Sequence, residues 1–202
     1  ENILLGKFAR DFIFQIPELL KTEKNPKPTA SMVANGYLLM FGPEHAEEQY
    51  KALENHKACE AGTKNIKGSE LEKFFPYINS EGIETATFTD NKSEGWIDPF
   101  MFHSALKSKA TELGADFTKG EVKSLSEIKA KTIVSAAGCW TKELLEDIPV
   151  EPQKHTVFRV KCPKHIPEMP LTGDLTTGVY WRPEGKEYLA GSPKSIFDAK
   201  DL

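Results

Sequence analysis

The nine residues TIVSAAGCW at positions 132–140 narrow the choice of fold more than any other part of the sequence. The β-branched run at their start predicts a buried strand, which ends directly in Ala136, Ala137 and Gly138. Because these residues have little or no side chain, backbone N–H groups at such a turn can approach a ligand closely. The pattern therefore predicts a strand that turns into a helix beside a cofactor. An ordinary strand-to-helix packing turn is the alternative.

The composition excludes several classes of protein. Of the 202 residues, 39% are hydrophobic, which is enough to build the core of one large or two small domains. The net charge of -4 and the absence of a Lys or Arg block argue against a nucleic-acid partner. The longest apolar run, residues 37–41, is far shorter than the roughly 20 residues that a spanning helix needs. We therefore expect a globular chain with no transmembrane segment.

The sequence also lacks the short motifs of several enzyme classes. Its five histidines show no HxxxH or HExxH spacing and its three cysteines form no CxxC pair, so we expect no metal site. No GxSxG segment is present to support a serine hydrolase. Neither GxGxxG nor a Walker loop occurs, so this stretch has no dinucleotide-binding loop of its own. Few, widely spaced cysteines favour a reducing compartment.

Two helices are expected in the first third of the chain. An apolar stripe that begins at Phe8 predicts the first, which Pro17 would kink or end because proline lacks a backbone donor. A linker at 21–29 follows, with two prolines and no periodicity. Pro43 then suits the first position of a second helix, and Gly62 supplies its stop.

Two further helices are marked by capping signals. Ser69 and Glu72 have the spacing of a capping box and predict a short helix. Asp98 followed by Pro99 predicts the start of a longer helix, which Gly114 ends. A role of Asp98 as a general base is the alternative, but a helix cap explains the residue more simply.

Runs of β-branched and aromatic residues predict strands. They lie at 36–41, 85–89, 117–122, 131–135, 155–161, 178–182 and 187–191. The last two are expected to form a hairpin across residues 183–186. By period two, Tyr180 and Arg182 share one face of their strand and Val179 and Trp181 the other, so one pair should face the core.

The order of these motifs resembles the D-amino-acid oxidase type of FAD-dependent oxidoreductases. The resemblance is carried by GWIDP, the helix after it, the GEV strand, the TIVSAAGCW turn and the hairpin TGVYWRPEGKEYLAGS, in that order. Four segments, NGYLLMF, FFPYINSEGI, EGWIDPF and PVEPQKHTVF, are similar to a mitochondrial member of that family associated with respiratory complex I. The resemblance covers essentially the whole chain.

The resemblance implies an α+β fold: a mixed, largely antiparallel sheet of a substrate domain with flanking helices, plus part of an FAD-binding Rossmann-like domain. It divides the chain into a helix and linker leaving the FAD domain (1–30), substrate domain (31–115), an FAD-domain strand-turn-helix element (116–150) and again substrate domain (151–202). The family's GxGxxG segment and carboxyl-terminal part are missing, and the stretch between Val122 and Lys131 is shortened. We therefore expect the central part of a longer protein.

The resemblance also implies cofactor-binding residues. In such proteins the strand after the Gly-Ala turn offers a backbone contact to the adenine end of FAD, which here falls on Val122. The turn passes close to the cofactor, so Ala136, Ala137, Gly138 and Trp140 inherit a cofactor-proximal role. The alternatives are a plain core strand for Val122 and a packing aromatic for Trp140.

Four residues become candidates for contact with the substrate. Lys154 and His155 lie where the family's chain enters the substrate domain near the flavin, and Tyr180 and Arg182 could orient an acidic substrate if their face opens on the flavin. For the first pair the alternative is a solvated or edge-strand position, and for the second an exposed sheet face.

Three functions are compatible with these observations. The first is an FAD-dependent oxidoreductase that acts on a C–N bond of a small-molecule amine or amino acid. The second is a non-catalytic assembly or scaffold protein of a respiratory complex that retains the fold, with complex I components as partners. The third is a small-molecule-binding α+β domain without redox chemistry. By resemblance we expect a mitochondrial, matrix-side location, with the bacterial cytoplasm as the alternative.

Overall fold

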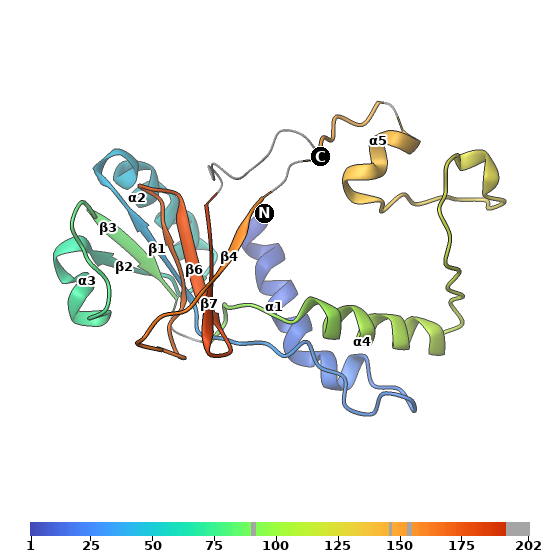
Figure 1. Cartoon of the computed structure of the whole chain (residues 1–202), viewed down its shortest axis with the longest axis horizontal. Helices are drawn as coiled ribbons and strands as arrows, with labels where there is room; N and C mark the ends of the chain where they lie inside the picture. Colours follow the sequence, from blue (N-terminus) through green and yellow to red (C-terminus); the bar gives the residue numbers. More distant parts are fainter. Residues whose placement is uncertain (90–91, 146, 153–154, 193–202) are drawn as a thin grey trace.

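The computed structural model describes residues 1–89, 92–145, 147–152 and 155–192. It has three parts: a sheet with two helices, a pair of helices beside it, and an extended segment that leaves the end of α4 (Figure 1). The segment 116–150 rises from the end of α4 and lies apart from the sheet in this view.

The sheet has seven strands in the order β2-β3-β1-β5-β6-β7-β4. All neighbouring strands pair antiparallel except β1 and β5, which are parallel. The predicted largely antiparallel sheet with flanking helices is therefore confirmed. The strands are β1 (Tyr37–Phe41), β2 (Lys64–Lys67), β3 (Thr85–Phe88), β4 (Val157–Val160), β5 (Leu171–Asp174), β6 (Val179–Glu184) and β7 (Glu187–Gly191).

Sequence reasoning did not predict two of these strands. β2 and β5 are four residues each, and neither has the apolar run that marks β1. The hairpin is confirmed, although its turn is tighter than expected: Glu184 pairs with Glu187, which leaves Gly185 and Lys186 as the loop. Gly185 has a φ of 61°, a conformation that glycine adopts at no steric cost.

The main core lies between one face of the sheet and α3 (Gly68–Phe74) with the chain that follows it. Leu38, Met40 and Ala86 from the sheet pack there with Leu71 and Ile78, and all five are buried. The other helix of this part is α2 (Pro43–Ala58), which begins at the expected proline.

The expected capping box of α3 is wrong. The helix begins at Gly68 with Lys67 as its N-cap residue, and no side chain caps it. Glu72 instead accepts hydrogen bonds from the backbone N–H and hydroxyl of Ser80. The Ser80 loop competes successfully for this carboxylate because it offers two donors.

A second, smaller core joins α1 (Asn2–Leu19) to α4 (Pro99–Glu112). The rings of Phe12 and Phe102 meet edge-on with their centroids 6.4 Å apart. Of the two effects predicted for Pro17, a kink or an end of the helix, the second is wrong, because α1 continues to Leu19. Proline removes only one hydrogen bond in the last turn, and burial of Ile16 and Leu20 offsets that loss. None of the helices in the described residues is long and apolar enough to cross a membrane.

The prediction for α4 is confirmed at both ends. Asp98 is the N-cap residue, and its Oδ1 accepts a hydrogen bond of 2.9 Å from the Met101 N–H. Gly114 has a φ of 97° just after the helix, where a residue without Cβ is favoured. Asp98 is therefore a helix cap.

A two-stranded antiparallel ribbon, residues 30–36 and 94–98, connects the helical pair to the sheet. Val33 and Trp96 exchange backbone hydrogen bonds of 2.8 and 3.1 Å at its centre. A Cβ on Gly95 would overlap the Val33 carbonyl oxygen, so the two chains can approach this closely only because Gly95 is glycine.

The segment after α4 differs from the sequence-based expectation. Of its described residues between 113 and 152, none is buried. The predicted strands at 117–122 and 131–135 are absent, because an isolated strand leaves its backbone groups unpaired and no described strand lies beside them. The turn and helix are present as η2 (Gly138–Trp140) and α5 (Thr141–Leu144), and a further turn, η1 (Leu125–Glu127), precedes them.

The accessible surface reflects this open arrangement. It amounts to 14801 Å², whereas a compact monomer of this mass exposes roughly 9,500 Å². Large apolar side chains contribute to the excess, among them Phe100 (78% exposed), Val134 (85%) and Trp140 (65%). The chain therefore presents much apolar surface that its own residues do not cover.

Candidate functional site

Tyr180 lies in the middle of the sheet between two glycines. In the strand register Gly173 of β5 and Gly191 of β7 are its direct neighbours. A Cβ on Gly191 would lie 2.5 Å from the Tyr180 hydroxyl oxygen, so the ring lies across this glycine. We call these three residues the Tyr180 seat. Both glycines are buried: the Tyr180 ring covers Gly191, and the Leu39 side chain lies 3.1 Å from where a Cβ on Gly173 would be, so the glycines make room for neighbouring side chains of the protein itself.

The seat lies on the face away from the main core. Trp181 packs against that core, and successive residues of a strand point to opposite faces. Tyr180 and Arg182 therefore share the other face, as their alternation predicted.

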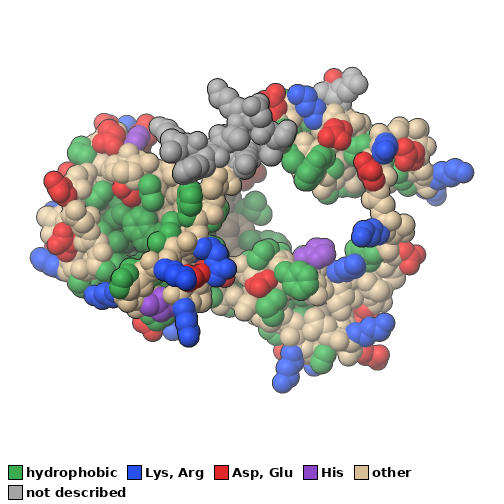
Figure 2. All heavy atoms as spheres, viewed as in Figure 1, with side chains coloured by type: hydrophobic (Ala, Val, Ile, Leu, Met, Phe, Trp, Pro, Cys, Tyr) green, Lys and Arg blue, Asp and Glu red, His purple; other side chains and the backbone are tan. Residues whose placement is uncertain are grey.

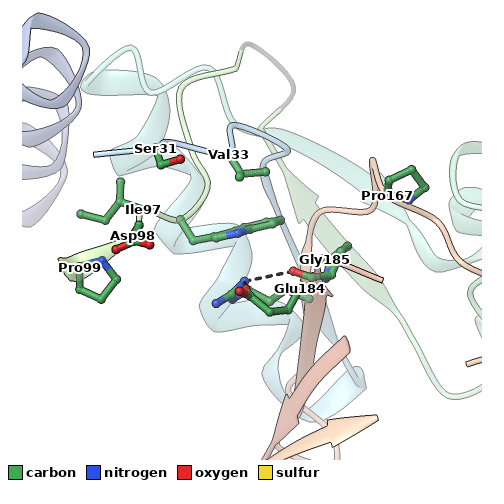
Figure 3. Close-up of a pocket in the computed structure, with 11 residues that line it drawn as sticks. Ser31, Val33, Ile97, Asp98, Pro99, Pro167, Glu184 and Gly185 are labelled. Atoms are coloured by element: carbon green, nitrogen blue, oxygen red, sulfur yellow. Dashed lines mark hydrogen bonds and ion pairs between the residues drawn. The ribbon is translucent and has the colours of Figure 1, made fainter. Parts of the chain in front are cut away.

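Arg182 is engaged by the ribbon and by its own hairpin. Its guanidinium carbon lies 5.0 Å from the centre of the Trp96 ring. Its Nη1 forms an ion pair with Glu184 and donates a hydrogen bond of 3.0 Å to the Pro183 carbonyl oxygen. A cavity of about 330 Å³ opens beside this group. Figure 3 shows the cavity around this group, with Asp98, Pro99 and Glu184 among the residues that line it.

Tyr37 and Glu94 lie where the ribbon meets β1, and both have raised pKa values. Burial raises the pKa of Tyr37, the Glu94 carboxylate raises it further, and the Arg182 guanidinium opposes both. Burial also raises the pKa of Glu94, against a hydrogen bond from Thr89 and the charge of His56. The place where the ribbon meets the sheet is therefore polar and partly shielded from water.

A second hollow, of about 480 Å³, lies on the segment 116–150. Three of the five residues predicted to be near a cofactor line it: Val122, Ala137 and Trp140. Ala136 and Gly138 are exposed on the same turn, outside the lining. The structure therefore brings most of this predicted set together, although the strands that were expected to carry it are absent.

Two features of this turn bear on its capacity to hold a ligand. The hydroxyl of Ser135 is buried and has no hydrogen-bond partner, so it is available to a ligand. Gly138 has a φ of 58°, and a Cβ there would meet nothing within 4 Å, so the backbone of the turn is open to close approach. Sequence reasoning missed Ser135, whose signal was only its place at the end of the apolar run.

The remaining predicted residues lie elsewhere. Lys154 is outside the described residues. His155 is exposed and lines neither hollow. The seat and the second hollow lie on separate parts of the molecule, and the space-filling view shows an opening between the segment 116–150 and the sheet (Figure 2).

Comparison with known families decides the class of protein. The family profile described as "DAO: FAD dependent oxidoreductase" matches residues 4–201. The chain belongs to this family. The predicted family and the FAD cofactor are therefore confirmed.

Curated relatives agree with this assignment. FAD-dependent oxidoreductase domain-containing protein 1 is 26% identical over 92% of this chain in Bos taurus and 26% identical over 100% of it in Xenopus laevis. These matches cover 48% and 50% of the relatives, so the chain spans about half of their length. The mitochondrial dimethylglycine dehydrogenase of Homo sapiens is 27% identical over 75% of the chain and 18% of that relative.

Solved structures share the fold. L-proline dehydrogenase from P. horikoshii superposes with a TM-score of 0.74 at 20% identity, over 97% of this chain and 56% of the other. Glycine oxidase from Geobacillus kaustophilus gives 0.71 at 17% identity, over 93% and 53%. At sequence identities of 20% and 17%, these superpositions establish a shared fold alone.

Proposed function

We propose that this chain is the substrate-facing part of an FAD-dependent oxidoreductase that oxidises a C–N bond of a small amine or amino acid. The family match over nearly the whole chain carries the proposal. The relatives and structural neighbours described as dimethylglycine dehydrogenase, L-proline dehydrogenase and glycine oxidase support a nitrogen-bearing substrate.

FAD, when bound, accepts the electron pair and hydrogen that leave the carbon next to the substrate nitrogen. The task of the chain is then to orient the substrate and to exclude water from it. The Tyr180 seat suits this task because the ring packs across Gly191, which holds the phenol hydroxyl at one place on the sheet face, where it would hydrogen-bond a polar group of the substrate. Arg182, on the same face, supplies a positive charge that would favour an acidic group on the substrate.

The turn of segment 116–150 would hold part of the cofactor. Val122, Ala137 and Trp140 offer an apolar hollow, and Ala136 and Gly138 continue the same turn. In addition to these predicted residues, the unpartnered Ser135 hydroxyl would hydrogen-bond a polar group of the bound molecule.

Ser135→Ala tests this assignment without an activity assay. Loss of a hydroxyl that contacts FAD should weaken FAD binding roughly 5- to 10-fold, the equivalent of one hydrogen bond of about 1–1.4 kcal/mol. Ser126→Ala is the matched control, because Ser126 is exposed and bonds only its neighbour Ser124. Equal FAD affinity of both variants and the parent, measured by titration of flavin fluorescence, would remove Ser135 from the site.

The reaction itself is tested by anaerobic reduction of the bound flavin. In the longest natural form of the protein, a panel of small secondary amines and amino acids should include one that bleaches the visible absorption. Tyr180→Phe should slow that bleaching, whereas Tyr50→Phe, on an exposed face of α2, should not. A flavin that no amine in the panel reduces would count against the C–N substrate.

A mitochondrial location is also part of the proposal. The relative described as mitochondrial dimethylglycine dehydrogenase supports it, and cell fractionation with an antibody to this chain tests it against the bacterial cytoplasm.

The comparisons do not favour the non-catalytic scaffold, because the solved structures that share the fold are described as dehydrogenases and oxidases. They also give no support to complex I components as partners.

A further inference from the structure

The ribbon is the joint between two differently packed parts of the molecule. On one side it continues into the core shared by α1 and α4, which includes Ala30 and Ile97. On the other side it runs into β1 through Gly36, whose N–H donates to the Glu94 carbonyl oxygen at 2.9 Å. Four backbone hydrogen bonds hold the two chains of the ribbon together, and a two-stranded ribbon of this size is only marginally stable alone.

One side-chain cluster fastens this ribbon to the sheet. Trp96 comes from the ribbon, and Arg182 and Glu184 come from β6, with the guanidinium carbon 5.0 Å from the centre of the indole ring. The ion pair with Glu184 and the hydrogen bond to the Pro183 carbonyl oxygen fix the guanidinium from the side of the strand. The guanidinium is thereby held over the indole ring at a distance typical of a cation–π contact.

We propose that Trp96 and Arg182 form a latch that clamps the ribbon to β6, and that Trp96 is a positioning residue for the Arg182 guanidinium. The latch has two effects. It restrains opening of the ribbon, and it holds the positive charge of Arg182 near Tyr37, beside the cavity that Asp98 also lines. The proposal rests on these contacts alone and is independent of the proposed reaction.

Amide hydrogen exchange measures opening of the ribbon directly. Trp96→Leu keeps an apolar side chain but removes the ring, and Arg182→Met keeps the length but removes the charge. Either substitution should speed exchange of the ribbon amides by roughly 2- to 30-fold, which corresponds to the free energy of one cation–π contact. The amides to follow are those of Val33, Gly36, Trp96 and Asp98, each of which donates a hydrogen bond across the ribbon.

Arg159→Met is the matched control. Arg159 of β4 also carries a guanidinium on an ion pair, with Glu187 at 2.6 Å, but it is largely exposed and lies on a strand that β7 separates from β6. This variant should leave the ribbon amides unchanged. The conservative variants Trp96→Phe and Arg182→Lys should restore most of the protection, and the double variant Trp96→Leu with Arg182→Met should exchange no faster than the worse single variant.

Two results would overturn the latch: ribbon amides that exchange at the parent rate in both single variants, or amides that speed up as much in Arg159→Met. If Trp96→Leu fails to fold, the exchange rates of the ribbon amides in Arg182→Met and Arg182→Lys test the latch without it. Equal exchange in these two variants would show that the charge of Arg182 does not hold the ribbon.

Discussion

Replacement of Gly95 by Ala tests how the two chains of the ribbon are held together. The added Cβ would overlap the Val33 carbonyl oxygen and lie 2.8 Å from its carbon, whereas real Cβ atoms essentially never approach another heavy atom within 3.0 Å. Both partners in this clash are backbone, so no side-chain rotation relieves it. The ribbon must open at its centre, where Val33 and Trp96 exchange hydrogen bonds.

The expected cost follows from these contacts. Two backbone hydrogen bonds contribute about 1 kcal/mol each, and forced overpacking adds about 1–3 kcal/mol. The lower entropy of the unfolded alanine chain returns about 0.4–1 kcal/mol. We therefore expect Gly95→Ala to lower the free energy of unfolding by about 2–4 kcal/mol, a large share of the total for an ordinary domain.

Urea denaturation followed by circular dichroism measures this loss. Gly120→Ala is the control, because a Cβ at Gly120 meets nothing within 4 Å and its φ is not positive, so its stability should change by less than about 0.5 kcal/mol. A Gly95→Ala variant as stable as Gly120→Ala would refute the close approach of the two chains and with it the described joint.

Three further predictions concern single residues. Asp98→Ala should lower the free energy of unfolding by about 1 kcal/mol through loss of the cap on Met101; an unchanged thermal midpoint would contradict the cap. Because burial raises the pKa of Glu94, its contribution to stability is complete below its ordinary pKa of 4.5 and is lost as the pH rises through the raised pKa. Glu94→Gln should therefore gain stability relative to the parent as the pH rises above 4.5, and parallel stability curves would contradict this. Gly191→Ala should displace the Tyr180 ring, whose hydroxyl lies 2.5 Å from the new Cβ, at a cost of roughly 1–3 kcal/mol because ring carbons also lie within 3.0 Å of it; a crystal structure with the ring in place would refute the seat.

The parts of the fold that depend on local sequence were predictable. The start of α4 followed from Asp98 and Pro99, whose cap and fixed φ act within a single turn. The β6–β7 hairpin followed in the same way from the turn residues around Gly185. Both signals lie within a few residues of the structure that they specify.

The parts that depend on distant partners were not predictable. The run at 131–135 has strand composition but no described strand beside it, so composition alone gave the wrong answer there. The latch was equally hidden, because nothing in the sequence connects Trp96 to Arg182, which the sheet brings together across eighty-five intervening residues. The open turn at Gly138 was expected, but the unpartnered Ser135 hydroxyl beside it emerged only with the structure.

The identity of the cofactor is the most direct test of the whole account. The measurement is a visible absorption spectrum of the purified protein in its longest natural form, followed by release and identification of any flavin. We predict bound FAD, with affinity that falls when Ser135 is replaced by Ala. A full-length form that carries no flavin and cannot be loaded with FAD would contradict the assignment of this chain to a working FAD-dependent oxidoreductase.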